Sequence, residues 1–307
     1  MSAKFDRDAA GNGVQAEYRF GAERVIIRWS FFLIDPEGEG TVRLTVRDRE
    51  GKTVLECISG QWEEEPAQSL LLHPRLWSGV SDPYLYTLEA LLLDRNGCCS
   101  DRICRSLALY RLEYRGDAGL FLNGNPFQER GVRYCLPAAS AEGQRRMLQD
   151  LQRMLELGVN TVYVEQGEGL LASFLRMCEK MGFLPGKGGE SAPMFCGGRD
   201  CLIHRETGPT TLFYRYKAEW SREPFVYIAP ESVKSCGDGT YTASVYSNCS
   251  RVVLYSDGVL HEFRSGSGEF VFRGIPGKRP CLVLTAEGDG CTESLSVHRA
   301  FVKQNIQ

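Results

Sequence analysis

The chain has few histidines and no long apolar run, and each shortage excludes a class of site. Its 307 residues include only four histidines, and no Cys-x-x-Cys or histidine pair accompanies Cys98, Cys99 and Cys104, so zinc-type spacing is absent. The longest apolar runs, such as Leu70–Leu72 and Ala90–Leu93, are far shorter than the ~20 residues of a membrane-spanning helix. We therefore predict no metal site, no cofactor and no membrane contact.

Charge and composition exclude two further classes of protein. Lysine and arginine number 36 against 39 aspartates and glutamates, a net charge of −3, and no run of five like charges occurs, so we expect no nucleic-acid partner. Hydrophobic residues make up 43% of the chain, which is typical of folded domains. The opening MSAKFDRDAAGNG lacks a secretory apolar stretch, and the twelve cysteines are scattered. We expect a cytoplasmic protein whose thiols are mostly reduced.

Alternating apolar and polar residues predict a β-sandwich at each end of the chain. From Val14 to about Glu113, short alternating stretches are divided by turns rich in glycine and aspartate, a pattern typical of antiparallel sheets. Alternation returns from Phe225 onward in five or more short stretches. The sequence therefore predicts sandwich domains at residues 1–114 and 219–307.

The pattern between the two sandwiches, over residues 115–218, is one of strands and helices in turn. Gly131–Cys135 and Asn160–Val164 are apolar stretches of the kind that form buried parallel strands. A helix follows each of them, and the two helices are predicted to end at Gly158 and Gly182. This βαβα order is the repeating unit of an α/β barrel or of a doubly wound sheet.

Several stretches together resemble glycoside hydrolase family 2, the family of β-galactosidases and β-glucuronidases. Four regions carry the resemblance in the family's order: His73–Leu88 (HPRLWSGVSDPYLYTL), Ala118–Val132 (AGLFLNGNPFQERGV), Gln149–Val162 with Cys178–Leu184, and Phe213–Pro230. In the same order, the four regions are similar to the family's motif "P-x-LW", to its motif "FxLNGxPxxLRGV", to its motifs "LGxNxVR" and "LCDExGLL", and to the end of its catalytic barrel. The resemblance implies two immunoglobulin-like β-sandwiches flanking a truncated TIM-barrel-like βαβα segment.

The resemblance also shows what is missing. A complete barrel takes ~250 residues, whereas Arg130–Lys217 spans 88, of which the glycine-rich stretch 185–208 has no period and is predicted to be a loop. Members of the family that this chain resembles use two catalytic glutamates, on the fourth and seventh barrel strands. The segment is too short to contain either strand, so the resemblance implies that both glutamates are missing. The family's jelly-roll domain is missing as well, and Arg133 and Cys135 stand where an asparagine and a histidine are usual.

Five residues are weak candidates for a site. Glu165 and Glu168 follow a barrel-type strand, where catalytic groups usually lie, although acids there more often cap the next helix, which we prefer. Tyr134, Tyr163 and Trp220 could stack on a sugar, although aromatic residues in strands more often form core.

The first hypothesis is that the chain is a β-galactosidase-like protein of carbohydrate metabolism that has lost glycosidase chemistry. It would bind carbohydrate or a protein partner, and its open α/β segment could also support a homo-oligomer. The alternative is an active O-glycosyl hydrolase that uses a rebuilt or subunit-shared carboxylate site. A third hypothesis is a decayed product with little stable function.

Overall fold

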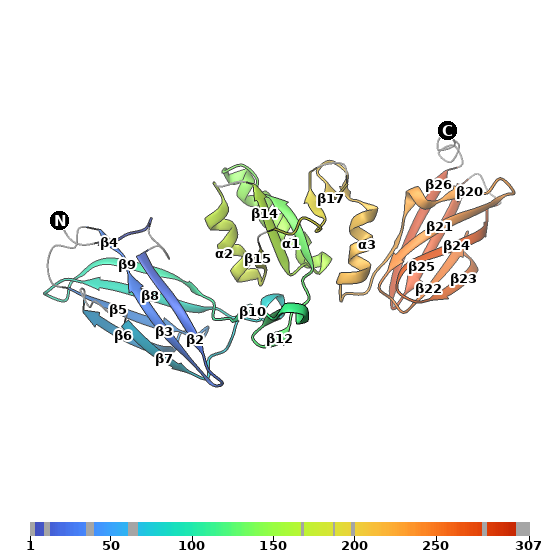
Figure 1. Cartoon of the computed structure of the whole chain (residues 1–307). Helices are drawn as coiled ribbons and strands as arrows, with labels where there is room; N and C mark the ends of the chain where they lie inside the picture. Colours follow the sequence, from blue (N-terminus) through green and yellow to red (C-terminus); the bar gives the residue numbers. More distant parts are fainter. Residues whose placement is uncertain are drawn as a thin grey trace. The chain divides into compact units, whose positions relative to one another are not determined.

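The computed structural model describes residues 4–8, 13–34, 40–60, 67–166, 169–186, 188–197, 200–277 and 281–298. Strands dominate these residues, and the chain divides into two compact units, Met1–Gln128 with Leu175–Phe183 and Glu129–Phe174 with Leu184–Gln307 (Figure 1). None of the described helices combines the length and the apolar character that crossing a membrane requires. All twelve cysteines are free thiols.

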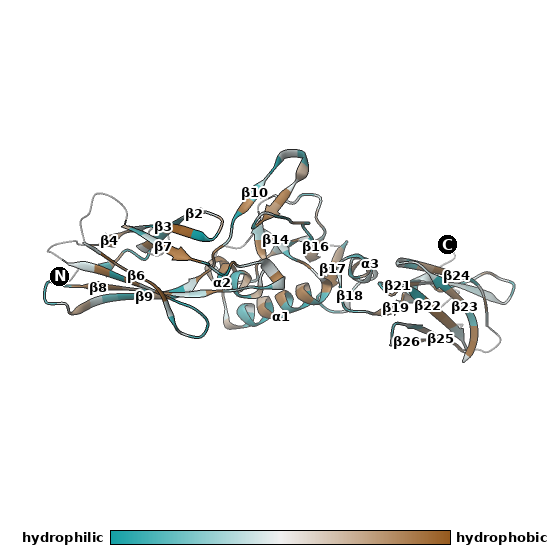
Figure 2. Ribbon diagram, turned by 90° about the horizontal axis from the view of Figure 1, so that it is seen from below, coloured by the Kyte–Doolittle hydropathy of each residue, from teal (hydrophilic) through white to brown (hydrophobic). Residues whose placement is uncertain are grey.

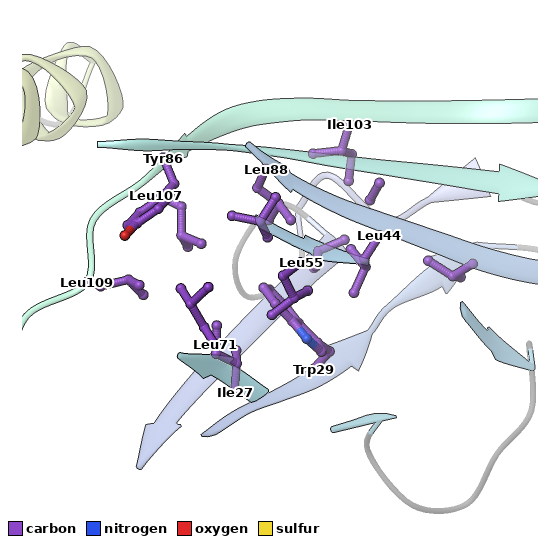
Figure 3. Close-up of a cluster of buried hydrophobic side chains, with 14 of the residues drawn as sticks. Ile27, Trp29, Leu44, Leu55, Leu71, Tyr86, Leu88, Ile103, Leu107 and Leu109 are labelled. Atoms are coloured by element: carbon purple, nitrogen blue, oxygen red, sulfur yellow. The ribbon is translucent and has the colours of Figure 1, made fainter. Parts of the chain in front are cut away.

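The first unit contains an antiparallel β-sandwich. Its three-stranded sheet has the order β2 (Val14–Phe20), β3 (Arg24–Phe31), β7 (Ala67–Leu72). Its four-stranded sheet has the order β6 (Thr53–Gly60), β5 (Thr41–Arg47), β8 (Tyr86–Leu93), β9 (Cys99–Leu107). Figure 3 shows Trp29, Leu44 and Leu88 from the two sheets pointing toward one another, and all three are fully buried. Alternate residues of each strand form this core, as the period of two predicts.

Two small sheets complete the first unit, and a buried tryptophan joins it to the end of α2. The small sheets are β1 (Lys4–Phe5) with β4 (Leu33–Ile34), and β10 (Leu112–Tyr114), β11 (Leu120–Leu122), β12 (Asn125–Pro126). Trp77 is 2% exposed, and its Nε1 donates to the Glu179 carbonyl at 2.8 Å, so this residue is part of the packed interior of the unit. Gly182 packs so tightly that a Cβ there would lie 2.4 Å from the Gly79 carbonyl oxygen.

The second unit contains a six-stranded sheet and helices α1 (Ala141–Leu157), α2 (Leu171–Met181, shared with the first unit) and α3 (Thr211–Trp220). The sheet has the order β15 (Leu184–Gly186), β14 (Thr161–Gln166), β13 (Gly131–Cys135), β16 (Met194–Cys196), β17 (Cys201–His204), β18 (Gly208–Pro209). All neighbours are parallel except β17 and β18. Ser140 caps α1, and Gly158 ends it at φ 88°. Figure 2 shows hydrophobic residues recurring along α1.

The prediction that residues 185–208 form a loop is wrong. β16 and β17 lie inside this stretch, and β16 extends the sheet on the far side of β13 from β14. Strands of three and four residues are too short to show a period. β16 pairs with β13, about sixty residues earlier in the chain, and β17 pairs in turn with β16. The described sheet is open, with β15 and β18 at its edges. Its origin in a barrel stays a prediction.

The second unit also contains an antiparallel β-sandwich at its C-terminal end. In one sheet β21 (Thr240–Ser247) pairs with β19 (Val226–Ile228), β20 (Lys234–Ser235) and β24 (Gly268–Pro276). The other has the order β23 (Val259–Ser265), β22 (Arg251–Ser256), β25 (Cys281–Gly288), β26 (Cys291–His298). If β19 and β20 count as one strand, the order of strands equals that of the first sandwich. The sandwiches expected at the two ends are therefore present.

Candidate functional site

One face of the six-stranded sheet collects polar side chains at the carboxyl ends of β13 and β14. Arg133 and Tyr163 are register partners, so they lie on the same face. Glu165 lies further along β14, at a shift of the register, and its ion pair with Arg133 brings it to the same site. Tyr134 lies on the opposite face, where α1 and α2 pack. In open parallel sheets ligands bind beyond the carboxyl ends of the strands, so this edge is the candidate site.

An ion pair forms the centre of the candidate site. Arg133 Nη1 lies 3.0 Å from Glu165 Oε1, and each side chain is 31% exposed. Arg133 Nε also donates to the Ala192 carbonyl at 2.9 Å, which fixes the guanidinium plane. Within the described ranges, no other hydrogen bond holds the remaining Arg133 nitrogen or the second Glu165 oxygen. The pair thus presents donors beside an acceptor at a partly open surface.

The preferred expectation that Glu165 caps the following helix is wrong. Glu165 lies within β14, which continues to Gln166, whereas α2 begins at Leu171 and has no acid in its first turn. The partner that holds Glu165 in place is Arg133, on the neighbouring strand. Glu168, the second catalytic candidate, lies outside the described residues.

Tyr163 is held in a cradle of glycines. A Cβ at Gly131, Gly186 or Gly189 would lie 2.4, 2.6 or 2.4 Å from the Tyr163 ring, so each of these positions has room only for glycine. The Tyr163 hydroxyl donates to Glu129 Oε1 at 2.9 Å. Burial, together with the Glu129 carboxylate, raises the pKa of Tyr163 to about 12. The ring packs against backbone, and this packing limits what it offers to a ligand.

Tyr134 cannot contact a sugar, and the expectation that it could is wrong. It is fully buried, between the rings of Phe174 and Phe195. Its hydroxyl donates to Asp150 Oδ2 at 2.9 Å, and burial raises its pKa above the usual range. The cause is strand alternation, because an even-numbered residue of β13 faces the helices.

Trp220 lies at the other end of the sheet. It is the last residue of α3 and packs against Tyr216, with ring centroids 4.6 Å apart. Its carbonyl accepts a hydrogen bond from Arg130 Nη1 at 3.3 Å, and Arg130 directly precedes β13. Since Glu165 lies at the carboxyl end of β14, the structure does not bring Trp220 together with it.

Sequence reasoning noted Arg133 only as a departure from a motif and missed its role as the partner of Glu165. No local signal links the two residues, because they meet only through the pairing of β13 with β14. Among the residues that the structure describes, no group of three histidine, cysteine or acidic side chains could hold a metal ion.

Comparison with known proteins identifies the fold. No model of a protein family matches the chain. The chain is 32% identical over 98 residues to a β-glucuronidase of Bacteroides fragilis, a match that covers 30% of this chain and 14% of that protein.

Solved structures match far more of the chain. An FMN-binding β-glucuronidase from Facaelibacterium prausnitzii L2-6 matches with a TM-score of 0.78 and 16% identity, over 96% of this chain and 75% of that one. A glycosyl hydrolase family 2 member from Bacteroides cellulosilyticus matches with a TM-score of 0.70 and 13% identity, over 96% and 64%. The resemblance to glycoside hydrolase family 2 is therefore confirmed at the level of the fold.

Proposed function

We propose that this chain is a glycoside hydrolase family 2-like protein of carbohydrate metabolism that binds a carbohydrate without cleaving it. The fold supports the family. The observation that carries the proposal is the Arg133–Glu165 pair, in which the acid at the strand end faces a guanidinium. We assign the six-stranded sheet as a barrel remnant, because β13, β14 and β15 are consecutive and parallel, as at the start of a barrel.

The carboxylates on this face are poorly arranged for hydrolysis. A retaining glycosidase holds two carboxyl groups ~5 Å apart, one to donate a proton and one to attack the sugar. Here Glu165 is ion-paired with Arg133, and Glu129 accepts a hydrogen bond from Tyr163. Glu165 is thus engaged by a cation and Glu129 by a hydroxyl. We infer that the chain has no glycosidase activity.

The same pair is well arranged for binding. A guanidinium offers fixed N–H donors, and a carboxylate offers only acceptors. Arg133 and Glu165 lie side by side, and each side chain is about one-third exposed. The pair matches two adjacent hydroxyls of a pyranose, one that accepts a hydrogen bond from the guanidinium and one that donates to the carboxylate. The ligand class that this chemistry fits is a sugar with vicinal hydroxyl groups.

Calorimetry with methyl β-galactoside and methyl β-glucuronide tests the binding proposal. Arg133→Met and Glu165→Gln should each weaken binding at least ~10-fold, since each leaves a polar group of the site unpaired. The matched control is Arg145→Met, which breaks the exposed Arg145–Glu142 pair of α1 and should leave binding unchanged. Equal binding by all three variants, or no binding by the unaltered protein, would refute the site.

Hydrolysis of 4-nitrophenyl β-glucuronide or β-galactoside tests the alternative of an active enzyme. We expect no turnover above that of buffer. Turnover that Glu165→Gln abolishes would show an active glycosidase and overturn the proposal.

We also propose a cytoplasmic location, because twelve free thiols are typical of a reducing compartment. We further propose that the open α/β sheet binds a partner protein or a second copy of the chain. Size-exclusion chromatography of the chain alone tests the second of these.

A further inference from the structure

The C-terminal sandwich places two thiols against two consecutive carbonyl groups of the chain. The Cys249 thiol, in the turn between β21 and β22, lies 3.5 Å from the Phe225 carbonyl oxygen. The Cys291 thiol, at the start of β26, lies 3.0 Å from the Pro224 carbonyl oxygen. Consecutive residues advance only ~3.3 Å along an extended chain, so the two sulfurs that contact them are neighbours. Both cysteines are free thiols.

A glycine leaves room for the two thiols to meet. Gly288 and Cys291 are register partners, directly opposite each other at the turn that joins β25 to β26. A Cβ at Gly288 would lie 3.0 Å from the Cys249 Cβ and 3.1 Å from the Cys249 Sγ. Cys249 therefore fills the space where a side chain at Gly288 would lie. Since the side chains of directly opposed residues share a face, with Cβ atoms about 4.5–5.5 Å apart, the Cys291 side chain lies within reach of Cys249.

Hydrogen bonds hold this pair of cysteines in place. The backbone N–H of Ser250 donates to Asp289 Oδ2 at 3.3 Å, which fixes the turn that carries Cys249 against the turn before Cys291. The backbone N–H of Cys249 donates to Ser247 Oγ at 3.0 Å. A disulfide needs Cβ atoms about 3.5–4.5 Å apart, and only a small shift of these two turns is required to reach that separation.

The two thiols differ in their access to solvent. Cys249 is fully buried, whereas Cys291 is half-buried. Burial raises the pKa of the Cys249 thiol, and the nearby Cys291 acts in the same direction. A thiol reacts as its thiolate and only where a reagent can reach it. A dissolved oxidant therefore meets Cys291 first, and Cys249 can react only with what has formed on Cys291.

We propose that Cys249 and Cys291 form a redox-controlled disulfide, with a small disulfide of the glutathione class as the oxidant. The Cys291 thiolate attacks one sulfur of the small disulfide, and the other half leaves as a thiolate that takes up the proton lost by Cys291. Cys249 then loses its proton and attacks the Cys291 sulfur, which releases the second half as a thiol. Two protein thiols are oxidised to one disulfide, and one small disulfide is reduced to two thiols.

The bond would act as a stability switch of the C-terminal sandwich. It closes a loop that contains β22, β23, β24 and β25, and closing such a loop restricts the unfolded chain. In the reducing compartment proposed above the pair stays in the thiol form until small disulfides accumulate. The switch is separate from the Arg133–Glu165 pair and does not depend on any carbohydrate function.

Oxidation of the full chain with glutathione disulfide tests the proposal. After alkylation of the remaining thiols and proteolysis, mass spectrometry should find one linked pair of peptides that contains Cys249 and Cys291. The melting temperature should rise by ~5 °C or more on oxidation. The matched control is Cys236→Ser, which removes an exposed thiol of the same sandwich and should form the same link.

Two variants separate the steps of the reaction. In Cys249→Ala the second thiol is absent, so glutathione should stay attached to Cys291 and the melting temperature should not rise. Cys291→Ser keeps a donor for the Pro224 carbonyl, so in reducing buffer it should melt within ~2 °C of the unaltered chain. After treatment with glutathione disulfide, this variant should show an unmodified Cys249.

Three results would overturn the proposal. The first is glutathione that stays on Cys291 of the unaltered chain, because Cys249 would then be out of reach. The second is a chain in which neither cysteine of the pair is oxidised. The third is an equal rise of the melting temperature in Cys249→Ala, because the stabilisation would then come from another pair of thiols.

Discussion

The buried pair of Tyr134 and Asp150 should make a large contribution to holding α1 on the sheet. Asp150 is 8% exposed, and the Tyr134 hydroxyl donates to it at 2.9 Å. Tyr134→Phe keeps the ring and its contacts with Phe174 but removes the donor. A buried hydrogen bond to a charged group is worth about 1.5–3 kcal/mol, so we expect a loss of this size at pH 7.

The loss should depend on pH. Burial, the largest cause, raises the pKa of Asp150 above its usual 3.8, while the bond from Tyr134 acts in the opposite direction. An acid whose pKa is raised by folding contributes its full stability below the unfolded pKa and loses it as pH rises through the folded pKa. Tyr134→Phe raises the folded pKa further. The deficit should therefore be largest at pH 7 and shrink to ~1 kcal/mol near pH 3.5, where a neutral bond is lost.

Hydrogen exchange followed by mass spectrometry suits this measurement, because the chain has two units and global unfolding need not be two-state. Peptides from α1 and β13 should exchange faster in Tyr134→Phe, while β21 of the C-terminal sandwich serves as internal control. Asp150→Asn keeps an acceptor for Tyr134 but removes the charge, so its stability should not change with pH through this site. A Tyr134→Phe deficit below ~0.5 kcal/mol, or one equal at both pH values, would refute the reasoning.

Two further predictions concern steric fit and charge. Gly131→Ala would place a Cβ 2.4 Å from the Tyr163 ring, so it should lower the free energy of unfolding in urea by about 1–3 kcal/mol. In a Tyr163→Ala background the same substitution should cost little, and additive effects of the two substitutions would contradict the glycine cradle. The hydrogen bond from Arg47, together with Arg102, lowers the pKa of Glu89 below its usual 4.5. The Glu89 carboxylate therefore stabilises the folded state above pH 4.5, and this contribution is lost as pH falls through the pKa of Glu89 in the folded protein. In thermal melts, Glu89→Gln should be ~1 kcal/mol less stable than the unaltered chain at pH 7 and as stable as that chain near pH 2. The same difference in stability at both pH values would count against the ion pair.

Local signals in the sequence determined the outline of this protein. Alternation with a period of two predicted both sandwiches, since each strand must bury every second residue. Gly158 and Gly182 marked the ends of helices because both adopt a positive φ of 88° there. The order of the motifs pointed to the fold that the solved structures share.

Tertiary pairing decided the candidate site. Tyr134 and Tyr163 are the same kind of residue on adjacent strands, yet one faces the helices and the other faces a cradle of glycines. Glu165 is paired with Arg133, 32 positions earlier. The short strand β16 pairs with the edge of β13, and β17 pairs with β16. These outcomes depend on which distant segments meet, and no local pattern of residues carries that information.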